Sequence, residues 1–104
     1  MSAMNRNFFM LPNEIFSFEL KPREFIVLCC LLRYADRETL SCFPSRRTIA
    51  KECRMDRKTV DSAIARLCLL GLVKKTARRR KDGAKTSNMY YLADLLNFGE
   101  LSME

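Results

Sequence analysis

Residues 44–71 read PSRRTIAKECRMDRKTVDSAIARLCLLG, and this stretch decides the fold. Ser45 follows a proline and is placed to cap a helix, so we expect a helix over 46–53. Asp56 is a second good capping residue, and it predicts another helix over 57–70. The stretch therefore predicts two helices that are separated by a tight turn of three residues.

The second predicted helix has one apolar and one polar face. Apolar residues recur at intervals of three and four, and so share a face: Val60, Ala63, Ile64 and Leu67. At roughly 100° per residue, the opposite face carries Lys58, Ser62 and Ala65, with Thr59 and Arg66 on one flank. This is the pattern of a helix-turn-helix, whose second helix enters the major groove of DNA. The alternative is a pair of amphipathic helices in a small bundle.

A hairpin is predicted directly after this helix pair. Gly71 is a left-handed cap that ends the second helix, and 72–78 has the alternation of a strand. Residues 78–85 hold five basic residues around an Asp-Gly turn signal. The chain returns as a strand over 88–92, with Tyr90 on one face together with Leu92. A hairpin with a basic tip in this position is a wing.

The remaining segments complete a three-helix core. Residues 22–36 are apolar nearly all round, which predicts the central helix. We expect a helical turn over 14–18 and a loop over 37–43, with Phe43 anchoring that loop to the core. Residues 1–7 are expected to form a flexible arm.

The fold class that follows is mainly α with a small β-hairpin, a winged helix-turn-helix. At 104 residues we expect a single domain over 1–104, ending in a short helix and tail over 93–104. No apolar run reaches the length of a membrane span, and the N-terminus lacks an export signal. We therefore expect a cytoplasmic protein without a membrane partner.

The positive charge is concentrated in one part of the chain. The net charge is +7, yet residues 1–44 are neutral and 86–104 carry only acidic charge. Residues 45–85 hold fourteen Lys and Arg against four Asp and Glu. A surplus of positive charge that is confined to one segment favours a polyanionic partner, here double-stranded DNA. The alternative is a basic surface that serves only solubility.

Catalytic and metal-binding functions find little support. The chain has no histidine and no glycine-rich phosphate loop, so we expect no enzyme and no cofactor. Its five cysteines show no paired ligand spacing, and we interpret them as reduced thiols, mostly buried, rather than as a metal site: Cys29, Cys30, Cys42, Cys53 and Cys68.

The predicted DNA contacts fall into three groups. Base edges are assigned first to Lys58 and Ser62, and then to Arg57, Thr59 and Arg66. Phosphates are assigned to Arg46 and Arg47 in the first turn of the preceding helix. The wing contributes phosphate or minor-groove contacts from Arg78, Arg79, Arg80, Lys81 and Lys85. For Lys58 the alternative is a phosphate contact or a solvated charge, and for the wing residues it is a floppy solvated loop. Asp61 is expected to pair with Arg57 one turn earlier, or to discourage binding to wrong bases.

Several short motifs in order resemble a known family. They are Phe9-x-Leu11-Pro12 with Ile15-Phe16, Phe43-Pro44-Ser45 with Thr48-Ile49-Ala50, Thr59-Val60 with Leu67, Gly71-Leu72-Val73, and Ser87-Asn88-x-Tyr90-x-Leu92. Over residues 8–92 the chain resembles the N-terminal winged-helix domains of plasmid and phage replication initiators from Gram-positive bacteria, and related small DNA-binding proteins of mobile elements. The resemblance implies that the helix starting near Arg57 lies in the major groove and that the hairpin touches flanking backbone or minor groove.

Two departures from that family bear on function. Many helix-turn-helix proteins have glycine first in the turn, where this chain has Arg54. Initiators usually continue into further domains, whereas this sequence ends at Glu104. The leading hypothesis is therefore a sequence-specific regulator or accessory factor of a mobile element. The alternatives are a replication initiator or its N-terminal part, and a winged-helix protein-interaction module. A homodimer is a further hypothesis, with Leu69 and the C-terminal segment as candidate contacts.

Overall fold

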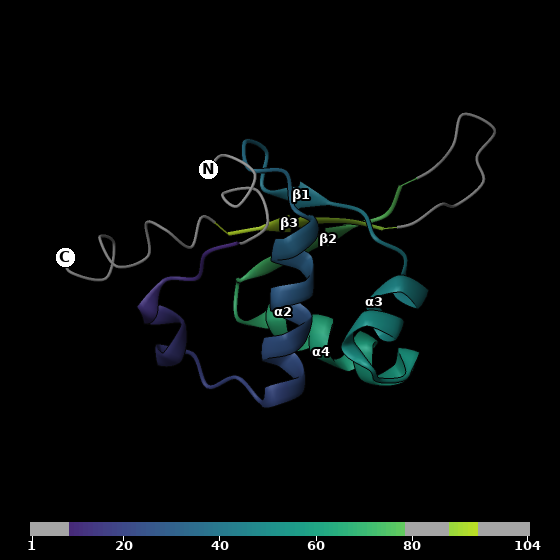
Figure 1. Cartoon of the computed structure of the whole chain (residues 1–104), viewed down its shortest axis with the longest axis horizontal. Coiled ribbons are helices and arrows are strands. Elements are labelled where there is room, and N and C mark those ends of the chain that lie inside the picture. The colour runs from purple at the N-terminus through teal and green to yellow at the C-terminus, as the bar shows by residue number, and fades with distance from the viewer. Residues whose placement is uncertain (1–8, 79–87, 94–104) are drawn as a thin grey trace, which may run out of the picture.

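Within the residues that the computed structural model describes, 9–78 and 88–93, three α-helices and a small antiparallel sheet form the fold (Figure 1). In chain order the elements are η1 (Asn13–Ser17), α2 (Pro22–Tyr34), β1 (Ser41–Cys42), α3 (Arg46–Cys53), α4 (Arg57–Leu69), β2 (Val73–Thr76) and β3 (Met89–Leu92). The strand order is β1-β3-β2, so β3 lies in the middle of the sheet. The three helices gather on one side of it (Figure 1). The predicted fold class, mainly α with a winged helix-turn-helix, is confirmed.

Both predicted helix caps are present. The Ser45 hydroxyl oxygen accepts a hydrogen bond from the Thr48 backbone N–H at 3.0 Å, and the Asp56 carboxylate accepts one from the Thr59 N–H at 2.8 Å. Each bond satisfies an N–H group that has no partner inside its own helix. The caps therefore set where α3 and α4 begin, as the sequence predicted.

The turn between these helices has a left-handed residue. Arg54 lies at φ 58° and ψ 49°, and the Met55 N–H returns to the Ala50 carbonyl oxygen at 3.1 Å. This is the conformation for which glycine is favoured, because a side chain there costs on the order of 1 kcal/mol. The tight reversal that orients α4 against α3 is therefore made with a residue that is strained in this position.

The core is centred on α2, which packs mainly against α4. Val27, Leu28 and Leu31 of α2 are fully buried, as are Val60 and Leu67 of α4 with their neighbours on the predicted apolar face. α2 ends at Tyr34, two residues earlier than predicted, because the backbone becomes extended at the next position. The prediction that this helix lies at the centre of the core is confirmed, and its predicted length is nearly correct.

The predicted loop over 37–43 is wrong in one respect, because it contains strand β1. Ser41 pairs with Tyr91, and Cys42 with Tyr90. Successive residues of a strand face opposite sides, and here Cys42 points into the core with 3% exposure. Phe43, predicted to anchor the loop in the core, is instead 56% exposed. The pairing partner lies almost fifty residues away, so local sequence does not reveal it.

Strand β3 follows the predicted alternation, but β2 does not, because two buried residues, Leu72 and Val73, are followed there by two exposed lysines. β2 pairs with β3 in an antiparallel register that places Val73 opposite Leu92. Tyr90 and Leu92 are buried, whereas Tyr91 is exposed. Gly71 lies at φ 80°, as expected of a left-handed cap. The predictions for the arm, for the hairpin tip (79–87) and for the segment 94–104 lie outside the described residues.

Candidate nucleic-acid interface

The outer face of α4 is open to solvent. Lys58, Ser62 and Ala65 are exposed, and the flanking Thr59 and Arg66 are half-buried. Because the opposite face is buried in the core, the helix presents this strip to solvent. The sequence-based assignment of faces on α4 is therefore confirmed in its geometry.

A polar hollow lies at the start of this strip. It has a volume of about 200 Å³ and is lined by Lys58, Thr59 and Ser62 of α4 and by Arg23 of α2. Arg23 lines this hollow although the sequence did not point to it. Its only local signal is a cation in the first turn of a helix, where the macrodipole disfavours positive charge. The hollow joins two cationic side chains to two hydroxyl groups, a set that suits phosphate oxygens and base edges.

An ion pair joins α3 to α4. The Arg46 Nε donates to Asp61 Oδ1 at 2.8 Å, and Nη2 donates to Oδ2 at 2.6 Å. The expected pair between Asp61 and Arg57 is therefore wrong, because the guanidinium of the neighbouring helix reaches the carboxylate in a two-point geometry that is stronger than a single contact. Arg57 and Arg47 remain exposed.

Tyr90 of the wing strand β3 lies close enough to this ion pair for its hydroxyl to respond to both charges. Tyr90 is 1% exposed, and burial raises the pKa of its hydroxyl. A hydrogen bond with Asn88 opposes that rise, and the charges of Asp61 and Arg46 act on the same hydroxyl in opposite directions. The tyrosine thus places the wing within electrostatic reach of both helices of the helix-turn-helix.

The base of the wing is tied to the segment that leads into α3. The Arg78 guanidinium carbon lies 4.3 Å from the centroid of the Phe43 ring, within the range of a cation–π contact. The other predicted wing contacts lie outside the described residues: Arg79, Arg80, Lys81 and Lys85.

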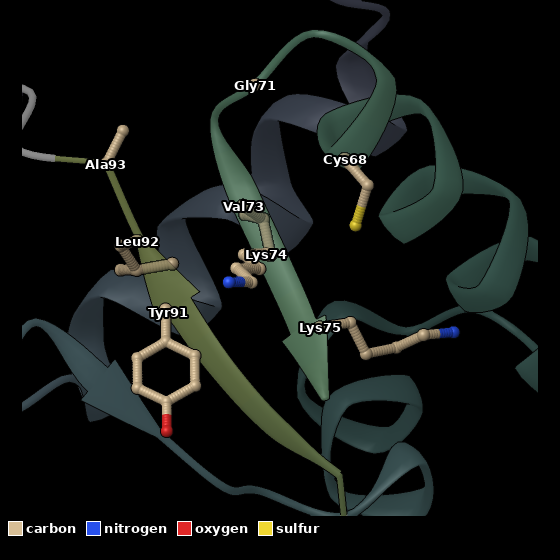
Figure 2. A pocket seen from close by; sticks show the side chains of 8 residues that line it. All are labelled: Cys68, Gly71, Val73, Lys74, Lys75, Tyr91, Leu92 and Ala93. Carbon is tan, nitrogen blue, oxygen red and sulfur yellow. The ribbon is translucent and has the colours of Figure 1, made fainter. Parts of the chain in front are cut away.

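A larger hollow lies between the end of α4 and the wing strands (Figure 2). Its volume is about 570 Å³, and its apolar lining includes Val73 and Leu92, beside Cys68 of α4. Lys74 and Lys75 line it from β2 and add positive charge. This hollow therefore occupies the junction where the wing joins the second helix of the pair.

Across 9–78 and 88–93, no group of three or more Cys, Asp or Glu side chains is arranged to hold a metal ion, and all five cysteines are free thiols. Over the same ranges, no helix has the length and apolar character needed to cross a membrane.

Fold and surface together define a winged helix-turn-helix, the fold of DNA-binding transcriptional regulators. The helix-turn-helix domain family matches residues 19–73, more than half of the chain, and the chain belongs to that family. No curated protein sequence matches this chain.

Solved structures share this fold at low sequence identity. An N-terminal domain of a DNA-binding protein has a TM-score of 0.61 at 17% identity, over 89% of this chain and 79% of that one. The PcaV transcriptional regulator from Streptomyces coelicolor has a TM-score of 0.56 at 22% identity, and the match covers 73% of this chain and 47% of PcaV. NMB1585, a MarR family regulator from Neisseria meningitidis, has a TM-score of 0.50 at 16% identity, and the match covers 86% of this chain and 57% of NMB1585. This chain thus spans about half the length of PcaV.

Proposed function

We propose that this protein binds double-stranded DNA in a sequence-specific manner and acts as a transcriptional regulator or accessory factor of a mobile element. α4 would lie in the major groove, with Lys58 and Ser62 on base edges. The observation that carries the proposal is the exposed polar strip of α4, with its hollow shared with Arg23, on a helix-turn-helix scaffold. Lysine suits the guanine acceptors, and a serine hydroxyl can bond to any base.

Phosphate contacts would fix the register of α4 in the groove. Arg46 and Arg47 lie at the start of α3, and Arg78 lies at the base of the wing. The remaining basic residues of 79–85 would add charge that neutralises flanking phosphates. Phosphate contacts position a protein on the duplex, whereas base contacts provide the discrimination.

The test is selection of bound duplexes from a random pool, followed by titration of the selected duplex and a shuffled one at several salt concentrations. We expect one preferred site and saturable binding, with log K falling linearly against log salt by about 0.9 per neutralised phosphate. Equal affinity for both duplexes would refute the sequence-specific role. No binding at low salt would instead favour a protein-interaction module.

The biological role can be read from the same selection. The resemblance to plasmid and phage proteins supports a function within a mobile element. Repeats of the selected sequence at a replication origin would favour an initiator, and a single site at a promoter would favour a regulator. A palindromic site and a native mass of two chains would support a homodimer, for which Leu69, 76% exposed on α4, offers a contact.

A further inference from the structure

The ion pair between Arg46 and Asp61 leaves part of its guanidinium able to bind another group. Nε and Nη2 supply the two bonds to the carboxylate, and the Arg46 and Asp61 side chains are 46% and 50% exposed. A guanidinium has five N–H donors, so donors on Nη1 remain for a further acceptor. Arg46 can therefore hold the Asp61 carboxylate and one phosphate oxygen at the same time.

The carboxylate also fixes where that free edge points. A two-point contact determines the plane of the guanidinium, whereas an unpaired arginine must lose its side-chain freedom when it binds. Asp61 lies on α4 beside Ser62 and one turn after Lys58. The phosphate position that Arg46 prefers is thus set relative to the residues that face the bases.

Resting on the DNA binding proposed above, we propose that Asp61 determines specificity as a positioning residue. It orients Arg46 toward one backbone phosphate, and so sets the register in which Lys58 and Ser62 meet the bases. When the protein lies on DNA in any other register, the Asp61 carboxylate places a negative charge close to the duplex. This charge weakens binding in those other registers. Asp61 touches Arg46 and needs no contact with a base.

Removing Asp61 then has two opposite effects. The surface gains one net positive charge, which strengthens binding to any duplex. Arg46 loses its fixed orientation, which weakens the preference for one site. A residue with a merely structural role would lower stability and weaken both kinds of binding together, so the ratio of the two affinities separates the roles.

The experiment compares wild type with Asp61→Asn and Asp61→Ala, using the duplex that wild type selects from a random pool and a shuffled duplex of equal composition. We expect the affinity ratio between the duplexes to fall about tenfold in Asp61→Ala, and less in Asp61→Asn, which keeps one acceptor oxygen. Affinity for the shuffled duplex should rise in both variants. Thermal melts check that each variant is folded, and Asp61→Asn serves if the alanine variant is not.

Two controls isolate the mechanism. Glu38→Gln makes the same change in charge on the exposed loop before β1, and should leave the ratio unchanged. In an Arg46→Ala background, Asp61→Ala should lower the ratio no further. An unchanged ratio in the Asp61 variants, an equal fall in Glu38→Gln, or additive effects with Arg46→Ala would each overturn the inference. Failure of wild type to prefer its selected duplex would instead overturn the proposed function itself.

Discussion

The guanidinium of Arg78, at the base of the wing, lies over the Phe43 ring at 4.3 Å. Phe43 lies two residues before Ser45, the cap of α3, so this contact joins the wing to the start of the helix-turn-helix. It also accounts for a large aromatic side chain that is more exposed than buried. The Phe43 ring therefore contacts the base of the wing instead of being buried in the core.

We expect Phe43→Ala to lower the free energy of unfolding by about 0.5–1 kcal/mol, the usual value of an exposed cation–π contact. Phe43→Tyr should retain most of that stability, whereas Phe43→Leu, which keeps apolar volume without a ring, should not. Urea denaturation of Phe43→Ala, Arg78→Ala and the double variant measures the coupling between the two residues. Zero coupling would show that the contact contributes nothing.

The exposed strip of α4 predicts which residues discriminate between DNA sites. Lys58→Ala and Ser62→Ala should each reduce the preference for the selected duplex, by at most the roughly 1–3 kcal/mol that a good bidentate base contact provides. Lys58→Arg, which keeps the charge, should preserve affinity for a shuffled duplex. Ser17→Ala, at an exposed position on η1, is the matched serine control. Competition binding measures the preference, and an unchanged preference in both alanine variants would exclude the assigned base contacts.

The left-handed turn residue predicts a stabilising substitution. Arg54→Gly should be more stable than Arg54→Ala by about 1 kcal/mol, because glycine adopts positive φ without a steric penalty. The comparison with alanine removes the contribution of the long arginine side chain. Thermal or urea unfolding measures the difference. Equal stabilities would mean that the turn at φ 58° carries no strain.

The cap of α4 predicts a dependence on acid. Hydrogen bonds from Thr59 to Asp56 lower the pKa of the Asp56 carboxyl below its usual value. Because the folded pKa is the lower one, the stabilisation is present above the unfolded pKa and is lost as the pH falls through the folded value. Asp56→Asn keeps an acceptor oxygen but does not titrate, so its melting temperature should fall less than that of wild type on acidification below about pH 4. An equal fall in melting temperature with decreasing pH for wild type and Asp56→Asn would contradict this assignment.

The buried thiols predict a pattern of chemical reactivity. Burial raises the pKa of Cys30 to about 12, with neighbouring Cys53 adding to the shift, and burial raises that of Cys42 to about 11. Since the thiolate is the reactive form, both residues should resist iodoacetamide at pH 8 in the folded protein and react readily in urea. Mass spectrometry of labelled peptides locates the modified cysteines. Rapid labelling of Cys42 without denaturant would show that the β1 edge opens.

The sequence by itself determined the features that depend on neighbours along the chain. Ser45 and Asp56 cap the helices they precede, because each side chain reaches an N–H group three residues later. The buried face of α4 follows from the 3.6-residue period, and the placement of Tyr90 and Leu92 follows from the two-residue period of a strand. Such interactions span at most one or two turns, so they can be read from adjacent letters.

Only the tertiary structure decided which distant residues share a surface. The pairing of β1 with β3, the choice of Arg46 rather than Arg57 as partner of Asp61, and the place of Arg23 beside Lys58 all join separate elements of the fold. The Arg46–Asp61 pair joins two consecutive helices, and the other two relationships join elements further apart, but each depends on how the helices and the sheet pack around one core. That packing depends on many apolar contacts acting together. No single stretch of the sequence therefore reveals which residues lie next to each other at the surface.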